Sequence, residues 1–281
     1  MRKTVLPPGT VTPEETARFA AAAGMVMRRP TAAAQGETGI GTLREKRLHA
    51  ALKLYVCPDK SCHEKPIPEL APDNTFPKAD KVADVLTPDG HIYEIQTGGF
   101  CPLKRKLALY LAATDYDITV VHPVAFTKYL SWLDPADGTV LSRTRSPKHG
   151  KVTDIAGELY WLSDFIGNPR FSLQLVFLEI EEYRFKDGWS KDGKRGSSRY
   201  ERFPTALCGT VTLSTPADYA EWFLPPSLGT GAFTAADYAK ASGIRGRASY
   251  GVLHLLVRLG VLAETDKIGR AQGFVRNIPL I

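Results

Sequence analysis

A β-hairpin at residues 81–97 is the feature that most narrows the fold this chain can adopt. Two short runs with β-branched and aromatic residues flank a Pro- and Gly-containing turn at residues 87–90, which is the pattern of two paired strands. The strands carry three oxygen-bearing side chains, Asp84 on the first and Glu94 and Gln96 on the second. Since Glu94 and Gln96 are two residues apart, they lie on the same face of their strand. The hairpin therefore gathers these side chains at one place.

An α/β core is predicted around the hairpin. Apolar periodicity predicts helices before and after it, and β-branched runs predict buried strands. The expected helices cover 42–55, 103–113 and 154–166, the expected strands cover 118–124 and 171–184, and an accessory helix begins near Pro13. Turn-forming and charged residues predict irregular segments at 57–80, 134–151 and 186–202.

The C-terminal part predicts two helices followed by two short strands. Thr234 and Asp237 have the spacing of a capping box, which opens a helix that ends at Gly243. A second helix is expected over 247–259, and strands at 261–264 and 274–277 enclose a basic tip. At 281 residues the chain has room for two domains. We expect an accessory N-terminal segment at 1–41, an α/β core at 42–203 and a helix-turn-helix unit at 204–281.

Composition favours a folded protein with an anionic partner. The chain is 43% hydrophobic and 23% charged, which excludes a disordered polymer, and its net charge of +6 favours nucleic acid. No apolar run is long enough to span a membrane, the N-terminus lacks a signal-peptide core, and the four cysteines are scattered. We therefore expect a cytoplasmic protein that binds DNA and no membrane.

The order of helix, hairpin, helix and strand over residues 42–124 resembles the PD-(D/E)XK nuclease superfamily. The resemblance implies a restriction-endonuclease-like core, a mixed sheet flanked by helices, that hydrolyses phosphodiester bonds with Mg²⁺ or Mn²⁺. It makes Asp84 and Glu94 the metal ligands and Glu45 an optional acid on the first helix. No Pro precedes Asp84, and Gln96 replaces the usual Lys, so Lys104 is expected to supply the cation.

The C-terminal unit resembles the winged-helix family, in which the second helix enters the major groove and the wing contacts the backbone. Its expected DNA contacts are Arg245, Arg247 and Ser249 at the helix start and Lys267 and Arg270 in the wing. The core is expected to add Lys106, Arg143, Arg145 and Lys148.

These features predict a metal-dependent DNA endonuclease that is targeted by a winged helix, and a homodimer would suit cutting of both strands. Because Gln96 lacks the charge of Lys, a non-catalytic DNA-binding regulator with a nuclease-like core is the alternative. A scaffold whose winged helix binds another protein is the third reading. Zinc at Cys57, Cys62 and His63 would need further ligands close by, and no His base is placed beside Cys101 or Cys208.

Overall fold

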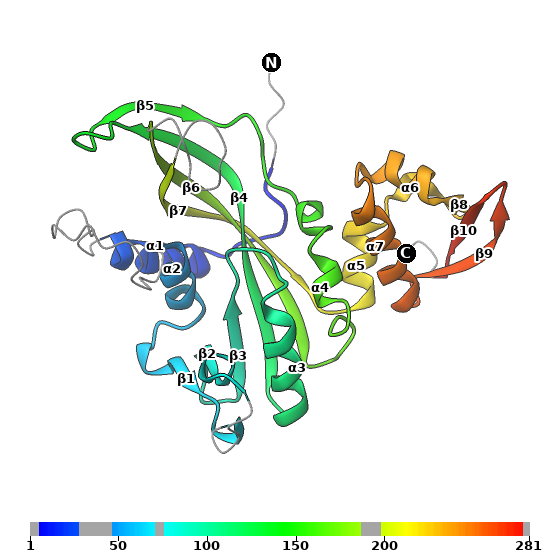
Figure 1. The fold of residues 1–281 in the computed structure, drawn as a ribbon, viewed down its shortest axis with the longest axis horizontal. Coiled ribbons are helices and arrows are strands. Elements are labelled where there is room, and N and C mark those ends of the chain that lie inside the picture. Colours follow the sequence, from blue (N-terminus) through cyan, green and yellow to red (C-terminus); the bar gives the residue numbers. More distant parts are fainter. Residues whose placement is uncertain (1–5, 28–46, 71–75, 187–197, 278–281) are drawn as a thin grey trace.

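A computed structural model describes residues 6–27, 47–70, 76–186 and 198–277 (Figure 1). In these residues one sheet has seven strands in the order β1-β2-β3-β4-β6-β7, with β5 also paired to β4. A second sheet has the order β8-β10-β9. The protein is thus a mixed α/β protein whose main sheet is flanked by helices, which confirms the fold class at this level.

The strands of the main sheet are β1 (His63–Pro66), β2 (Val82–Leu86), β3 (His91–Ile95), β4 (Asp117–Leu133), β5 (Val140–Arg145), β6 (Phe171–Phe185) and β7 (Ser198–Leu213). The helices are α1 (Pro13–Met27), α2 (Arg47–Val56), α3 (Leu103–Ala113), α4 (Leu159–Leu162), α5 (Pro216–Phe223), α6 (Ala235–Ser242) and α7 (Arg247–Arg258). The small sheet contains β8 (Phe233–Thr234), β9 (Leu262–Ile268) and β10 (Ala271–Arg276).

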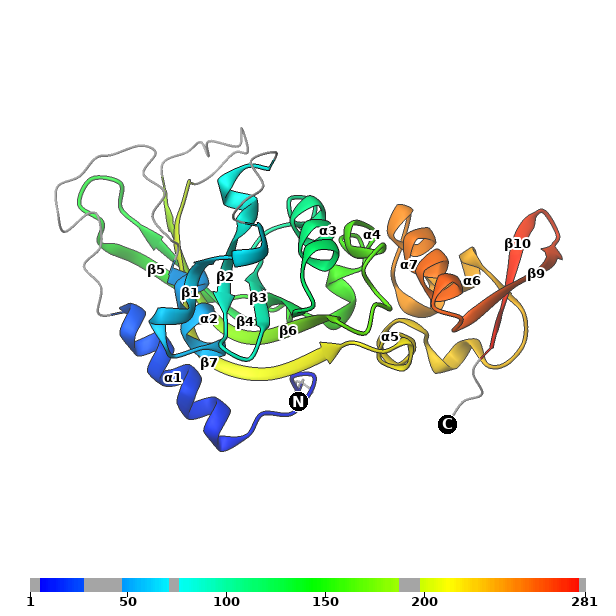
Figure 2. The ribbon, with the colours of Figure 1, turned by 90° about the horizontal axis from the view of Figure 1, so that it is seen from below.

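The main sheet is mixed and covered on both faces. Strands β1, β2 and β3 pair antiparallel, β3 with β4 and β4 with β6 pair parallel, and β6 with β7 pairs antiparallel. Successive residues of β4 point to opposite faces, so Val121 packs with α1 and α2 while Val120 packs in the cluster that contains α3 and α4 residues. Figure 2 shows α1 and α3 on opposite sides of the long strands.

One edge of β4 is shared between two strands. Its first residues, 117–121, pair with β3, and its last residues, 129–133, pair with β5. The stretch between them is bordered by loops instead of a strand. Residue Gln96, just after β3, donates its backbone N–H to Val121 O at 2.9 Å, and Ser146, just after β5, donates to Lys128 O at 2.8 Å. The unpaired stretch contributes Pro123, Ala125 and Lys128 to the cavity described below.

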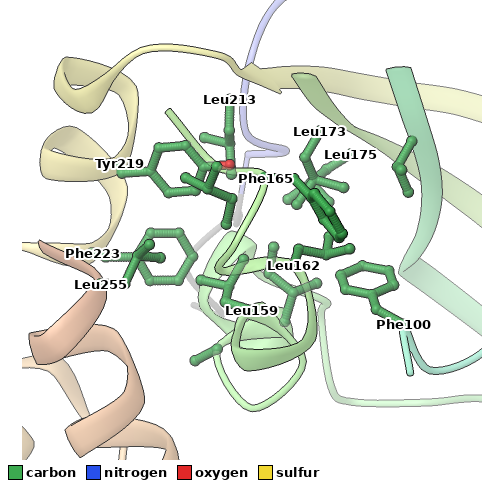
Figure 3. Close-up of a cluster of buried hydrophobic side chains, with 14 of the residues drawn as sticks. Phe100, Leu159, Leu162, Phe165, Leu173, Leu175, Leu213, Tyr219, Phe223 and Leu255 are labelled. Atoms are coloured by element: carbon green, nitrogen blue, oxygen red, sulfur yellow. The ribbon is translucent and has the colours of Figure 1, made fainter. Parts of the chain in front are cut away.

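A single hydrophobic cluster joins the main sheet to the C-terminal helices (Figure 3). Leu159, Leu162 and Phe165 lie against Tyr219 and Phe223 of α5, and Leu255 of α7 closes the cluster. All six side chains are buried. The C-terminal unit is therefore packed onto the core as part of one hydrophobic interior.

The structure confirms the hairpin, the helix near Pro13, the helix at 103–113, and the helix pair and strands of the C-terminal unit. The capping box of Thr234 and Asp237 is formed, and Gly243 ends α6 in the left-handed conformation with φ of 75°. Local sequence signals were sufficient for these elements because caps and turns act within a few residues.

Other predictions need correction. The segment 57–80 contains edge strand β1, the segment 134–151 contains β5, and the short strand at 118–124 is part of β4, which has 17 residues. The helix at 154–166 is replaced by a 3-10 turn (Val152–Ile155) and the short α4, with Gly157 between them. The boundary expected after residue 203 falls inside β7, so the sheet continues to Leu213.

We expect Phe223→Ala to lower the free energy of unfolding by about 3–5 kcal/mol, because it opens a cavity in the shared cluster. Scanning calorimetry should record a single transition for the wild type and the variant, since both parts share one core. Tyr250→Ala, on α7 but 57% exposed, is the matched control and should change stability by about 0.5 kcal/mol or less. Two separate transitions in the wild type would contradict a shared core.

Candidate functional site

The candidate site lies where the backbone pairing of β2 with β3 ends. The register Val85↔Tyr93 places Asp84 beside Glu94. Beyond this point, side-chain carboxylates bond to the backbone of the neighbouring strand. Asp84 Oδ2 accepts from the Ile95 N–H at 2.8 Å, and Glu94 Oε1 accepts from the Asp84 N–H at 3.4 Å. The hairpin thus fixes both carboxylates relative to the backbone.

Helices on both sides complete the cluster. From α3, Lys106 Nζ lies 2.7 Å from Glu94 Oε2, and the Tyr110 hydroxyl donates to Glu94 Oε1 at 3.4 Å. Lys106 and Tyr110 are four residues apart and share one face of the helix. From α2, His49 Nε2 lies 3.3 Å from Asp84 Oδ2. Four elements, α2, β2, β3 and α3, therefore meet at one acidic pair.

Burial sets the electrostatics of this pair. Glu94 is 2% exposed, and burial, with the neighbouring Asp84 charge, raises its pKa to about 7 although Lys106 opposes the shift. Burial also pushes the pKa of Asp84 upward, but the hydrogen bond and charge of His49, together with Lys106, outweigh it and leave that pKa lowered. Burial and Glu94 raise the pKa of Tyr110, so its hydroxyl stays protonated as a donor.

The structure brings Lys106, and not Lys104, to the acids. Lys104 Nζ lies 2.8 Å from Asp164 Oδ2 and its side chain is 49% exposed, whereas the side chain of Lys106 is 14% exposed. Helix periodicity contained this signal, because Lys106 lies three residues after buried Leu103 and one turn before buried Tyr110. Lys106 therefore occupies the position that sequence analysis gave to Lys104, and it does not lie on an open DNA-contact surface.

The other expected members are placed differently. Gln96 follows the end of β3, and its side-chain amide donates to Gly99 O, away from the acids. Its backbone oxygen accepts from His122 Nδ1 at 2.6 Å. Glu45 lies outside the described residues. His49 and Tyr110 were missed by sequence analysis, and only the tertiary arrangement identifies them.

In β5, Arg143 donates twice to Glu181 and stacks on the Tyr129 ring at 3.7 Å, so it is held by the protein. Arg145 and Lys148 are exposed.

In the C-terminal unit the expected DNA contacts Arg245, Arg247, Lys267 and Arg270 are exposed. Ser249 does not lie on that surface: it is 2% exposed and its hydroxyl donates to Gly246 O at 2.8 Å. Tyr250 of α7 is 57% exposed. Arg247 and Tyr250 are three residues apart in α7 and therefore lie on the same face of this helix.

The acidic pair suits a hard divalent cation. Mg²⁺ and Mn²⁺ take oxygen ligands, and Mg²⁺ commonly uses one or two carboxylates with water and substrate phosphate. Within the described ranges, no group of three or more His, Cys, Asp or Glu side chains is gathered to hold a metal.

Cys57 and Cys62 pack with Val85 in a small apolar cluster, and His63 Nε2 lies 2.8 Å from Cys57 O. Of the helices described, none is long and apolar enough to cross a membrane.

Comparison with known proteins gives a family and a relative. A family model described as "Domain of unknown function (DUF8091)" matches residues 46–214, which run from the start of α2 to just past β7. An "Uncharacterized protein" of Treponema pallidum (strain Nichols) is 32% identical over 163 residues, 58% of this chain. The matched region is 57% of that curated relative, so the match spans little more than half of its length. No solved structure matches this chain. Because the family model covers more than half of the chain, the protein belongs to the family described as "Domain of unknown function (DUF8091)".

Proposed function

We propose that the protein is a metal-dependent deoxyribonuclease with a restriction-endonuclease-like core. The observation that carries the proposal is the cluster of Asp84, Glu94 and Lys106 at the end of the β2–β3 pairing. The element order α2-β1-β2-β3-α3-β4, with β3 parallel to β4, supports it because it agrees with the resemblance to the PD-(D/E)XK superfamily. Lys106 from α3 would supply the charge that Gln96 lacks.

Asp84 and Glu94 would hold Mg²⁺ or Mn²⁺. The fit rests on two adjacent carboxylates, one of them buried with its pKa raised to about 7, because a cation beside them would favour the ionised form. When bound, the metal would polarise the scissile phosphate and supply a hydroxide nucleophile.

The remaining residues would orient the two acids and stabilise the negative charge of the phosphate. The Ile95 N–H and His49 fix the Asp84 carboxylate, and the Tyr110 hydroxyl fixes Glu94. The Lys106 ammonium, 2.7 Å from Glu94, would stabilise the negative charge that develops on the phosphate. With one such site in each chain, cutting both strands of a duplex would require a homodimer.

The C-terminal unit would select where the protein binds. We propose that α6, α7 and the β9–β10 hairpin form a winged helix that contacts DNA through Arg245, Arg247, Lys267 and Arg270. All four are exposed, and exposed cations supply the phosphate contacts on which DNA affinity depends.

A non-catalytic DNA-binding regulator is the second candidate. The contact between Lys106 and the buried Glu94 favours it because this contact engages the acid inside the protein. The Gln96 amide favours it because it donates to Gly99 O and is thereby engaged by the backbone. Cleavage assays separate the two candidates.

We expect the wild type to cut labelled linear, nicked, branched or single-stranded DNA with Mg²⁺ or Mn²⁺. Asp84→Asn and Glu94→Gln should abolish cutting because the metal loses its ligands, and Lys106→Ala should slow it roughly 10²–10³-fold, the usual cost of removing a charge-stabilising donor.

Lys104→Ala is the matched control, because it removes the same charge from the same helix at an exposed position. It should cut at the wild-type rate. Salt-sensitive binding without cutting in either metal would reject the nuclease and leave the regulator.

The raised pKa of Glu94 predicts a pH-dependent stability. Its pKa is near 4.5 when unfolded and about 7 when folded, so the stability present below the unfolded pKa is lost as pH rises through the folded pKa. Relative to Glu94→Gln, the wild type should lose about 3 kcal/mol of unfolding free energy between about pH 4 and pH 8, at roughly 1.4 kcal/mol per pKa unit. Denaturant titration at several pH values measures this difference.

Adding Mg²⁺ or Mn²⁺ above about pH 7 should raise the melting temperature of the wild type, since binding to the folded state stabilises it. Asp84→Asn and Glu94→Gln should show no such rise. An equal rise in all three proteins would place the metal elsewhere.

Arg247→Ala should weaken DNA binding and reduce the slope of log affinity against log salt by about 1, the effect of losing one phosphate contact. Ser249→Ala should leave affinity unchanged because that side chain is buried. Fluorescence anisotropy at several salt concentrations measures both, and unchanged binding by Arg247→Ala would exclude α7 from the interface.

A further inference from the structure

A cavity of about 530 Å³ lies beside the interrupted edge of β4. Its walls come from β4, β6 and β7 and from the loop that follows β5. The charged residues of the lining are four cations and two acids: Lys128, Lys148, Lys151, Arg202, Glu182 and Asp154. A concave, mainly cationic surface of this size is suited to an anionic ligand.

The loop wall is held in place by β4. Its backbone donates from Ser146 N to Lys128 O at 2.8 Å and from Gly150 N to Ala125 O at 3.0 Å, and His149 Nδ1 donates to Phe126 O at 2.9 Å. A Cβ at Gly150 would lie 2.7 Å from Ala125 O, so the close approach requires glycine. Lys148 and Lys151 are therefore carried by a fixed loop.

The two acids of the lining are already engaged. Glu182 is 1% exposed and holds Arg202 Nε at 3.4 Å and Lys128 Nζ at 3.8 Å. Asp154 accepts from the Lys151 N–H at 2.9 Å as part of a turn. In the part of the chain that the structure describes, no carboxylate pairs with the ammonium of Lys148 or Lys151. Those two cations are available to a ligand.

The cavity lies farther along β4 than the candidate active site and on the other face of the sheet. Glu94 is in register with Val120, which packs in the cluster that contains α3 residues. Ala125 and Ile180 of the cavity lining pack instead in the cluster that contains α1 and α2 residues.

We propose that this cavity binds a backbone phosphate of a DNA strand, through Lys148 and Lys151. The assignment of the ligand as DNA rests on the proposed nuclease function. Its assignment as a phosphate rests on the cavity and its cations. Lys128 and Arg202, set in position by Glu182, form the opposite wall.

The test compares DNA binding by the wild type and a Lys148→Ala/Lys151→Ala variant in EDTA, so that no cutting is needed. The probes are fluorescein-labelled single-stranded and duplex DNA, with affinity measured between about 50 and 200 mM salt. We expect the variant to bind at least about 10-fold more weakly and to reduce the salt slope by about 0.7 for single strands or about 0.9 for duplex, the effect of losing one phosphate contact.

Two controls separate charge from structure. Lys148→Arg/Lys151→Arg keeps the charge and should keep the slope. Lys60→Ala/Lys65→Ala removes two exposed lysines at and before the outer strand β1, neither of which lines the cavity, and should bind as the wild type does. An unchanged slope in the Lys148→Ala/Lys151→Ala variant would overturn the proposal.

A thermal shift with inorganic phosphate distinguishes the source of the phosphate. If inorganic phosphate stabilises the wild type but not the double alanine variant, while DNA binding is the same in both, a free phosphate compound is the ligand and the DNA assignment is overturned. If the double alanine variant has a reduced salt slope but the wild type never cuts DNA, the nuclease is rejected and this site is kept. If the wild type cuts DNA but the variant has an unchanged slope, this site is rejected and the nuclease is kept.

Discussion

The parallel pairing of β4 with β6 is the constraint on which the other elements depend. It runs from Ile118 to Leu133 on β4, far beyond an ordinary strand, and β7 continues it on the far side. Because β4 is so long, one edge can pair with β3 at its start and with β5 at its end. The acids lie beside the part of β4 that pairs with β3, and the interval between the β3 and β5 pairings contributes Pro123, Ala125 and Lys128 to the basic cavity.

Burial of Glu94 is the costly feature of this arrangement. A carboxylate with 2% exposure loses most of its hydration, and such a loss is tolerated only where hydrogen bonds and an opposite charge replace it. Lys106 and Tyr110 supply them from one face of α3, and the Asp84 N–H supplies a third contact. A core that needed only packing could hold an apolar residue here, and the proposed function would account for the acidic pair.

The parts that sequence analysis predicted are those that local signals determine. The Pro-Asp-Gly turn, the capping box at Thr234 and the periodicity of 103–113 each act within a few residues, and the structure confirms all three. The length of β4 depends on its pairing with β6, about 50 residues away in the chain, which no local pattern records. The strands β1 and β5 were missed although their partners, β2 and the end of β4, are closer in the chain.

Within the candidate site the same division holds. The hairpin and the periodicity of α3 are local and point to Asp84, Glu94 and Lys106, whereas the contact of His49 with Asp84 depends on where α2 packs. The junction between the sheet and the C-terminal helices likewise depends on contacts across the chain. Arg258 of α7 donates to Ile166 O at 3.1 Å, and Gly167, with φ of 95°, lies against Leu259. With Phe223 and Leu255 in the same cluster as Leu162, the two parts cannot reorient without exposing apolar surface. Under the proposed function, in which the protein would contact DNA at both places, this rigidity means that the second contact would form without a further loss of orientational freedom. The distance between the α7 surface and the acidic pair is then a fixed property of the fold.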